Sequence, residues 1–129
     1  MGSEVATVLV VEDEALIALD LQALLEETGY RVLGPANSSA AALKLLDETD
    51  PDVALLDVNL GRSEDVFDVA NELATRKSRV IFLTGHTVQR LPQAHRHRPL
   101  ISKPYLPHVV LRAVQAALTE ASPAKEKAA

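Results

Sequence analysis

Residues 7–14 read Thr7-Val8-Leu9-Val10-Val11-Glu12-Asp13-Glu14, an unbroken aliphatic run that ends on three carboxylates. A run of aliphatic residues without polar alternation is typical of a strand buried on both faces, as in a parallel sheet. The same pattern predicts further strands at 31–33, 53–57, 80–84 and 100–102. The second of the five is expected to end at Gly34-Pro35.

Apolar residues at helical spacing lie between these strands. They predict helices at 15–28, from 39 to about 48, at 65–77 and at 109–118. Gly29 should end the first helix and Pro107 should begin the last. The first helix is expected to turn Ile17, Leu21 and Leu24 inward.

The connection from His86 to Pro99 contains two prolines and few apolar residues. Any helix there, the fourth in order, should therefore be weak or irregular. Strands that alternate with helices predict an α/β fold, a single doubly wound domain whose five-stranded parallel sheet is flanked by helices. We expect this domain at 5–119 and a flexible tail at 120–129.

Composition restricts the function. The chain has 129 residues, which suits one domain. Its net charge of −5 argues against direct binding to nucleic acid or to an anionic membrane. It has no cysteine, so neither disulfides nor thiolate chemistry is expected. It shows no signal peptide and no long apolar run, so we expect a cytoplasmic protein.

Polar residues stand where the predicted strands end. Glu12 and Asp13 follow the first strand, Asp57 the third, Thr84 the fourth and Lys103 the fifth. In doubly wound folds, ligands bind beyond these carboxyl ends. Three carboxylates repel one another, and a hard cation such as Mg²⁺ relieves that repulsion while accepting phosphate oxygens. The set therefore suits phosphoryl transfer, with Asp57 as nucleophile, Thr84 as donor and Lys103 as counter-charge.

Each residue taken alone has a plainer explanation. Asp13 could cap the following helix, Asp57 could belong to a turn, and Thr84 could be an ordinary strand residue. Lys103 alone could be a solvent-exposed side chain. The functional interpretation rests on all of them falling at strand ends together.

Four motifs give the chain a family resemblance. Residues 8–14, 54–60, 81–85 and 102–105 read Val-Leu-Val-Val-Glu-Asp-Glu, Ala-Leu-Leu-Asp-Val-Asn-Leu, Ile-Phe-Leu-Thr-Gly and Ser-Lys-Pro-Tyr. Together they resemble the receiver domain of two-component response regulators. The resemblance implies that the protein takes a phosphoryl group from a sensor histidine kinase and signals through contact with a phosphotransfer or downstream regulatory protein. It also implies a protein that catalyses only its own phosphorylation and dephosphorylation.

The same resemblance assigns roles to single residues. It makes Asp57 the phosphoacceptor and a Mg²⁺ ligand, beside Glu12 and Asp13, of which Asp13 is the more direct ligand. The backbone carbonyl of Asn59 would complete the metal site. Thr84 would be the switch hydroxyl. Lys103 would be the lysine whose peptide bond to Pro104 the family usually holds in the cis form.

One position departs from the family pattern. Leu100 stands where receivers usually carry the aromatic switch residue, three positions before Lys103. The run Phe82-Leu83-Thr84-Gly85-His86 resembles a subfamily, often stand-alone, whose fourth strand reads Phe-Ala-Thr-Gly-Tyr and which lacks that aromatic. We therefore expect the segment 86–99 to be the mobile element of this protein.

Two surfaces are predicted outside the site. The basic cluster in the segment 86–99 is expected to be a solvated loop rather than a site for an anionic partner. Apolar residues on the last helix are expected to be exposed and available for contact. The first surface comprises Arg90, His95, Arg96, His97 and Arg98, and the second Val109, Val110 and Val114.

Three other functions stay open. A phosphohydrolase of the haloacid-dehalogenase kind also uses Asp, Thr and Lys at strand ends, but it needs a second Asp where Asn59 stands. A flavin-binding module would have to place phosphate beside Glu12 and Asp13, which would repel it. A receiver-like interaction module that is never phosphorylated is the third.

Overall fold

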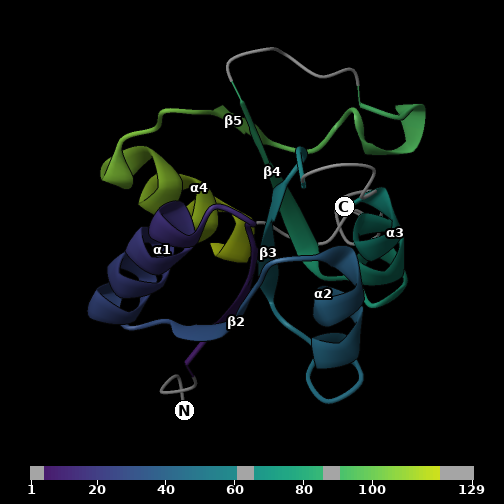
Figure 1. The fold of residues 1–129 in the computed structure, drawn as a ribbon, viewed down its shortest axis with the longest axis horizontal. Helices are drawn as coiled ribbons and strands as arrows, with labels where there is room; N and C mark the ends of the chain where they lie inside the picture. Colours follow the sequence, from purple (N-terminus) through teal and green to yellow (C-terminus); the bar gives the residue numbers. More distant parts are fainter. Residues whose placement is uncertain (1–4, 61–65, 86–90, 120–129) are drawn as a thin grey trace.

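The computed structural model describes residues 5–60, 66–85 and 91–119. Five parallel strands form one sheet in the order β2-β1-β3-β4-β5, with helices on both faces (Figure 1). This confirms the predicted doubly wound fold. The predicted tail at 120–129 lies outside the described residues. The elements are β1 (Thr7–Val11), α1 (Ala15–Thr28), β2 (Arg31–Ala36), α2 (Ser39–Leu46), β3 (Val53–Asp57), α3 (Phe67–Thr75), β4 (Arg79–Thr84), the 3-10 helix η1 (Gln93–His95), β5 (Leu100–Ser102) and α4 (Pro107–Thr119).

Two hydrophobic cores lie on opposite faces of the sheet, because successive side chains of a strand point to opposite faces. Val8 and Ile81 pack with α1 and α4, whereas Leu9 and Phe82 pack with α2 and α3. All residues of β1 and β3 are buried, as the unbroken aliphatic runs predict. The central strands are thereby held rigidly, and the residues that follow them are brought to one edge.

The ends of α1 and α2 follow the predicted signals. Gly29 ends α1 in the left-handed conformation, with φ of 109°. The Ser38 hydroxyl caps α2 by accepting a hydrogen bond from the backbone N–H of Ala41. Of the residues predicted to face inward on α1, Leu21 is buried, and Ile17 and Leu24 are partly buried against the same core. Ala18 and Leu25, which were not predicted, are the other buried residues of this helix.

The predicted end of the second strand at Gly34-Pro35 is wrong. β2 continues to Ala36 and contains a cis Gly34–Pro35 peptide bond. β2 lies at the edge of the sheet, where a residue without an N–H is tolerated. Gly34 has φ of 98°, and a Cβ there would lie 2.7 Å from the Ala36 nitrogen. Only glycine therefore fits at position 34 of this strand.

The connection between β4 and β5 is irregular, as predicted. Between Leu91 and Pro99 it contains only the three-residue helix η1, and residues 86–90, including Arg90, lie outside the described residues. Arg96 and His97 are exposed, but His95 is only 2% exposed. The prediction of a solvated basic loop is therefore wrong for His95, because aromatic side chains from α3 and β4 cover its ring.

The predicted contact surface on the last helix is also mostly wrong. Val110 and Val114 are completely buried, and only Val109 is partly exposed, at 38%. The two buried valines pack with Leu21 and Leu25 of α1 in one of the two cores. Among the described residues, no helix is long and apolar enough to pass through a membrane.

Candidate functional site

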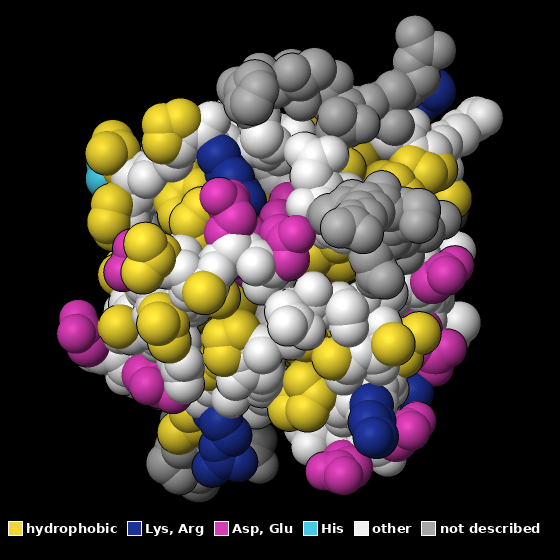
Figure 2. Space-filling model, in the orientation of Figure 1, with side chains coloured by type: hydrophobic (Ala, Val, Ile, Leu, Met, Phe, Trp, Pro, Cys, Tyr) yellow, Lys and Arg dark blue, Asp and Glu magenta, His cyan; other side chains and the backbone are white. Residues whose placement is uncertain are grey.

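Three carboxylates meet beyond the ends of β1 and β3. Glu12 and Asp13 follow β1, Asp57 ends β3, and one oxygen from each lies within 4.8 Å of the others. Glu12 and Asp57 are buried and Asp13 is exposed. Figure 2 shows acidic side chains gathered where β1 passes into α1, with a basic group beside them. The pairing of β1 with β3 thus assembles an acidic cluster that the sequence spreads over 46 positions.

Lys103 provides the positive charge of this cluster. Its Nζ atom lies 2.8 Å from Glu12 Oε1, 3.3 Å from Asp57 Oδ2 and 3.5 Å from Glu14 Oε1. The lysine is positioned by its backbone, whose N–H donates a hydrogen bond of 2.8 Å to the carbonyl of Thr84. The peptide bond between Lys103 and Pro104 is cis, as the family resemblance implies.

Burial and like charges set the protonation of the cluster. Burial raises the pKa of Glu12 to about 7, despite its hydrogen bond with Lys103. Desolvation, followed by repulsion from Asp57, raises the pKa of Asp13. Burial alone would lower the pKa of Lys103, but Glu12 and Asp57 reverse this and raise it. The site is therefore short of positive charge at neutral pH.

The loop after β3 holds Asp57 in a fixed orientation. The backbone N–H of Asn59 donates a hydrogen bond of 3.0 Å to Asp57 Oδ1. The N–H of Val58 donates to the carbonyl of Leu83 on β4. Thr84 is fully buried at the end of β4, and a Cβ on Gly85 would lie 3.3 Å from Asn59 Nδ2. The predicted site residues from β3, β4 and β5 are thus brought together at one edge.

The donor set fits Mg²⁺. Three carboxylates, whose oxygens are hard donors, converge here. Two of them are buried, and Lys103 forms an ion pair with both. Mg²⁺ prefers oxygen ligands and keeps several waters, so an incomplete carboxylate set with an exposed member suits it. Glu12, Asp13 and Asp57 would hold the ion, and the carbonyl of Asn59 is the further ligand expected from the family resemblance.

Two residues near the site were not predicted to belong to it. Glu14 forms an ion pair with Lys103. The only feature of the sequence that could have indicated this is its place in the acidic run 12–14. Tyr105 packs against the core shared by α1 and α4, and its hydroxyl is buried without a hydrogen-bond partner among the described residues. Burial and the Glu12 charge raise the pKa of Tyr105 to about 12.

Leu100, at the position where the family usually carries an aromatic residue, is 40% exposed on β5, and its Cα pairs with that of Phe82.

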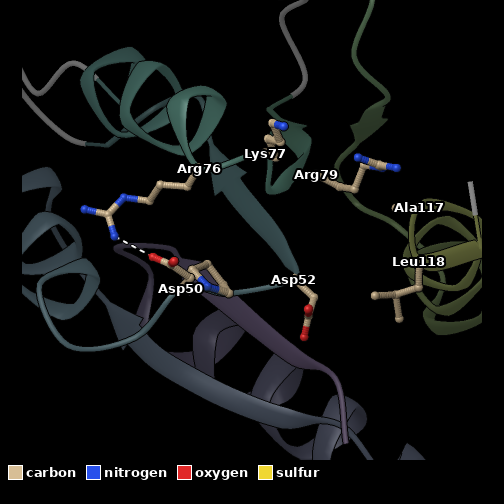
Figure 3. Close-up of a pocket in the computed structure, with 8 residues that line it drawn as sticks. Asp50, Asp52, Arg76, Lys77, Arg79, Ala117 and Leu118 are labelled. Carbon is tan, nitrogen blue, oxygen red and sulfur yellow. Dashed lines mark hydrogen bonds and ion pairs between the residues drawn. The ribbon is translucent and has the colours of Figure 1, made fainter. Parts of the chain in front are cut away.

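A separate pocket of about 320 Å³ opens at the opposite end of the sheet (Figure 3). It is lined by Asp52, before β3, by Arg79, at the start of β4, and by Leu118, near the end of α4. Arg76 on its rim is already paired with Asp50 at 2.6 Å. Its acidic and basic residues largely offset one another, and the carboxylate cluster is not part of it.

Comparison with known proteins places this geometry in a family. Residues 8–115 match the family model for the response regulator receiver domain. The chain belongs to the response regulator receiver family. This receiver is 36% identical over 123 residues to the phyllosphere-induced regulator PhyR of Methylorubrum extorquens, covering 92% of the chain and 46% of that protein. It is 34% identical over 90 residues to the transcriptional regulatory protein PdtaR of Mycobacterium tuberculosis, covering 69% of the chain and 43% of that protein.

Solved receivers share the fold. The PhyR receiver domain of Erythrobacter litoralis superposes with a TM-score of 0.81 at 27% identity, covering 95% of this receiver and 98% of that chain. SdrG of Sphingomonas melonis superposes with a TM-score of 0.77 at 35% identity, covering 89% and 98% respectively. The chain spans less than half the length of the curated relatives named above. The family match favours the receiver interpretation over a haloacid-dehalogenase-like hydrolase or a flavin-binding module.

Proposed function

We propose that this receiver accepts a phosphoryl group on Asp57 from the phosphohistidine of a sensor histidine kinase, in a Mg²⁺-dependent reaction. The observation that carries this proposal is the convergence of Glu12, Asp13 and Asp57 within 4.8 Å, with Lys103 against two of them. A site built only for stability would not need three carboxylates served by one lysine, because burying unbalanced charge is costly.

The geometry supports a simple displacement. Asp57 Oδ attacks the phosphorus, a P–O bond forms as the P–N bond breaks, and the bonding electrons return to the donor's imidazole nitrogen. Asn59 holds Asp57 through Oδ1, so Oδ2, near Lys103, is the oxygen placed to attack. Lys103 then pairs with the phosphoryl charge, and the Thr84 hydroxyl donates to a phosphoryl oxygen. Bound Mg²⁺ would neutralise the carboxylates and the phosphoryl oxygens.

An exposed apolar surface beside the site suits a kinase partner. Leu16 and Leu19 of α1 are 79% and 58% exposed, and Leu106, just before α4, is 60% exposed. Figure 2 shows hydrophobic side chains gathered over this flank, next to the acidic cluster. Large apolar side chains clustered on a surface mark protein contact sites. We propose that the kinase docks here, and that the receiver catalyses only its own phosphorylation and dephosphorylation.

Phosphotransfer profiling tests the function. The purified receiver is incubated with Mg²⁺ and either acetyl phosphate or a panel of autophosphorylated histidine kinases, and incorporation is followed by intact mass. We expect one phosphoryl group on the wild type and none on Asp57→Asn. The matched control Asp47→Asn, at an exposed carboxylate that ends α2, should be labelled like the wild type.

Three outcomes would contradict the proposal. Equal labelling of Asp57→Asn would move the acceptor elsewhere, and no labelling by any donor would favour the unphosphorylated interaction module. Sustained turnover of an aryl phosphate that depends on Asp57 would instead favour a hydrolase.

A further inference from the structure

The ring of His95 lies in an aromatic cluster made from three elements. It stacks on Phe67 of α3, with ring centroids 6.0 Å apart and an interplanar angle of 18°. It meets Phe82 of β4 edge-on at 5.8 Å and 72°, while the two phenylalanine rings lie 5.6 Å apart. Because η1 supplies only the histidine, His95 is the side chain that packs this short helix against the core.

Hydrogen bonds on both ring nitrogens fix the protonation state of His95. Arg98 Nε lies 3.0 Å from Nδ1, and a guanidinium can only donate, so Nδ1 is an acceptor without a proton. Nε2 therefore carries the single proton and donates it to Asn71 Oδ1 on α3, at 2.8 Å. Both nitrogens of the neutral ring therefore have a hydrogen-bond partner. In the charged ring, the proton on Nδ1 would face a donor instead of an acceptor.

Charges around the ring oppose its protonation. The charged groups that act on it among the described residues are Arg98 and His97 of its own segment. The residues that contact it from α3 and β4 are uncharged, namely Phe67, Asn71 and Phe82. Burial first, and then Arg98 and His97, lower the pKa of His95. A proton on Nδ1 would face the guanidinium of Arg98 directly and remove its hydrogen bond.

We propose that neutral His95 is a latch that holds residues 91–99 against α3 and β4, and that protonation of its ring releases them. Apart from His95, this segment is attached through the hydrogen bond from Phe82 N–H to the Pro99 carbonyl and through Leu91, which packs in the same core as Phe82. Phe82 lies two residues before Thr84 on β4, so the release would act on a strand that enters the phosphoacceptor site. The latch itself does not depend on phosphorylation.

The test uses NMR on the whole chain between pH 8 and pH 5. Long-range ¹H–¹⁵N spectra of the imidazole rings report the tautomer and midpoint of each histidine, and amide shifts report residues 91–99. We expect the Nε2–H tautomer at pH 8 and a midpoint for His95 below the ordinary value of about 6.5. The amides of residues 91–99 should change with that same midpoint.

Two variants separate the latch from general effects of acid. His95→Phe keeps an aromatic ring but cannot be protonated, so the transition of residues 91–99 should vanish. The matched variant His97→Phe, at an exposed position, should keep the transition. Arg98→Gln, which removes the facing cation, should move the His95 midpoint upward.

Several results would overturn the latch. An Nδ1–H tautomer at pH 8 contradicts the hydrogen bonding in the wild type itself, without recourse to any variant. A midpoint at or above 6.5, or amide shifts that persist in His95→Phe, would also exclude it. An unchanged midpoint in Arg98→Gln would remove the role of the guanidinium.

Discussion

Lys103 binds Glu12 more closely than it binds Asp57, with Nζ 2.8 Å from Glu12 Oε1 and 3.3 Å from Asp57 Oδ2. Glu12 is only 1% exposed, so its charge depends on this one cation among the described residues. The ion pair does not fully offset the desolvation, since the pKa of Glu12 remains raised to about 7. The ionised form of Glu12 is therefore less favourable in the folded protein than in the unfolded chain.

The first prediction concerns the stability of Glu12→Gln. Between the unfolded pKa of 4.5 and the folded pKa of about 7, the folded state holds a proton that the unfolded state lacks. The contribution of Glu12 to stability is therefore lost as pH rises through this range. Glutamine mimics the neutral acid, so above pH 7 we expect Glu12→Gln to exceed the wild type by on the order of 2 kcal/mol.

Urea denaturation in EDTA at pH 5, 6, 7 and 8 measures this difference. The matched control is Glu48→Gln, at an exposed glutamate just after α2, which should follow the wild type at every pH. A wild type that gains stability between pH 5 and pH 7 relative to Glu12→Gln would show that Lys103 outweighs the burial.

The second prediction concerns Mg²⁺. An ion that binds only the folded state raises its stability, by about 1.4 kcal/mol at ten times the dissociation constant, or roughly 5 °C in Tm. Asp13→Asn should remove most of this rise, because it deletes one of the three clustered carboxylates. Thermal unfolding against a Mg²⁺ titration measures the effect, and Asp47→Asn is the control that should keep it. Equal rises in both variants would place the ion elsewhere.

Much of the fold follows from the sequence because its signals are local. The unbroken runs at 7–11 and 53–57 are strands buried on both faces, and Gly29 ends α1 where predicted. The convergence of Asp13, Asp57 and Lys103 could also be predicted, since parallel strands bring these residues to the same edge whatever the details of packing.

The errors arise where tertiary contacts outweigh local pattern. His95 lies in a polar, basic stretch, and nothing nearby in the sequence shows that Phe67 and Phe82 will cover its ring. Val110 and Val114 are buried because α4 packs this face against β3 and β4, in a core with Ile81, and that docking is not visible in the helix's own residues. β2 passes through Gly34-Pro35 because it is an edge strand, a property of strand order and not of its own residues.

The third prediction concerns the missing aromatic. Leu100 is 40% exposed on β5, so a larger ring there can extend over the surface without displacing the core. Leu100→Tyr should therefore change the free energy of unfolding by less than about 1 kcal/mol. Ile101→Tyr, on the buried side of the same strand, is the comparison and should lose roughly 1–3 kcal/mol through overpacking. Similar losses in the two variants would show that position 100 is tightly packed.

The last prediction concerns Lys77, which has φ of 62° after the end of α3. A residue with a Cβ pays about 1 kcal/mol in this left-handed conformation, whereas glycine adopts it freely. The conformation is needed because Lys77 and Ser78 donate their N–H groups to the carbonyls of Ala74 and Leu73, closing the helix. Lys77→Gly should keep both bonds and relieve the cost.

Glycine also gains entropy in the unfolded chain, which offsets part of that relief. We therefore expect Lys77→Gly to raise the unfolding free energy by roughly 0.5 kcal/mol, measured by urea denaturation. Lys44→Gly, inside α2, should instead lower it by about 1 kcal/mol, because it places glycine in a helix of ordinary geometry. If both variants lost stability equally, the left-handed conformation at Lys77 would carry no strain, and the Lys77 side chain would instead stabilise the end of α3.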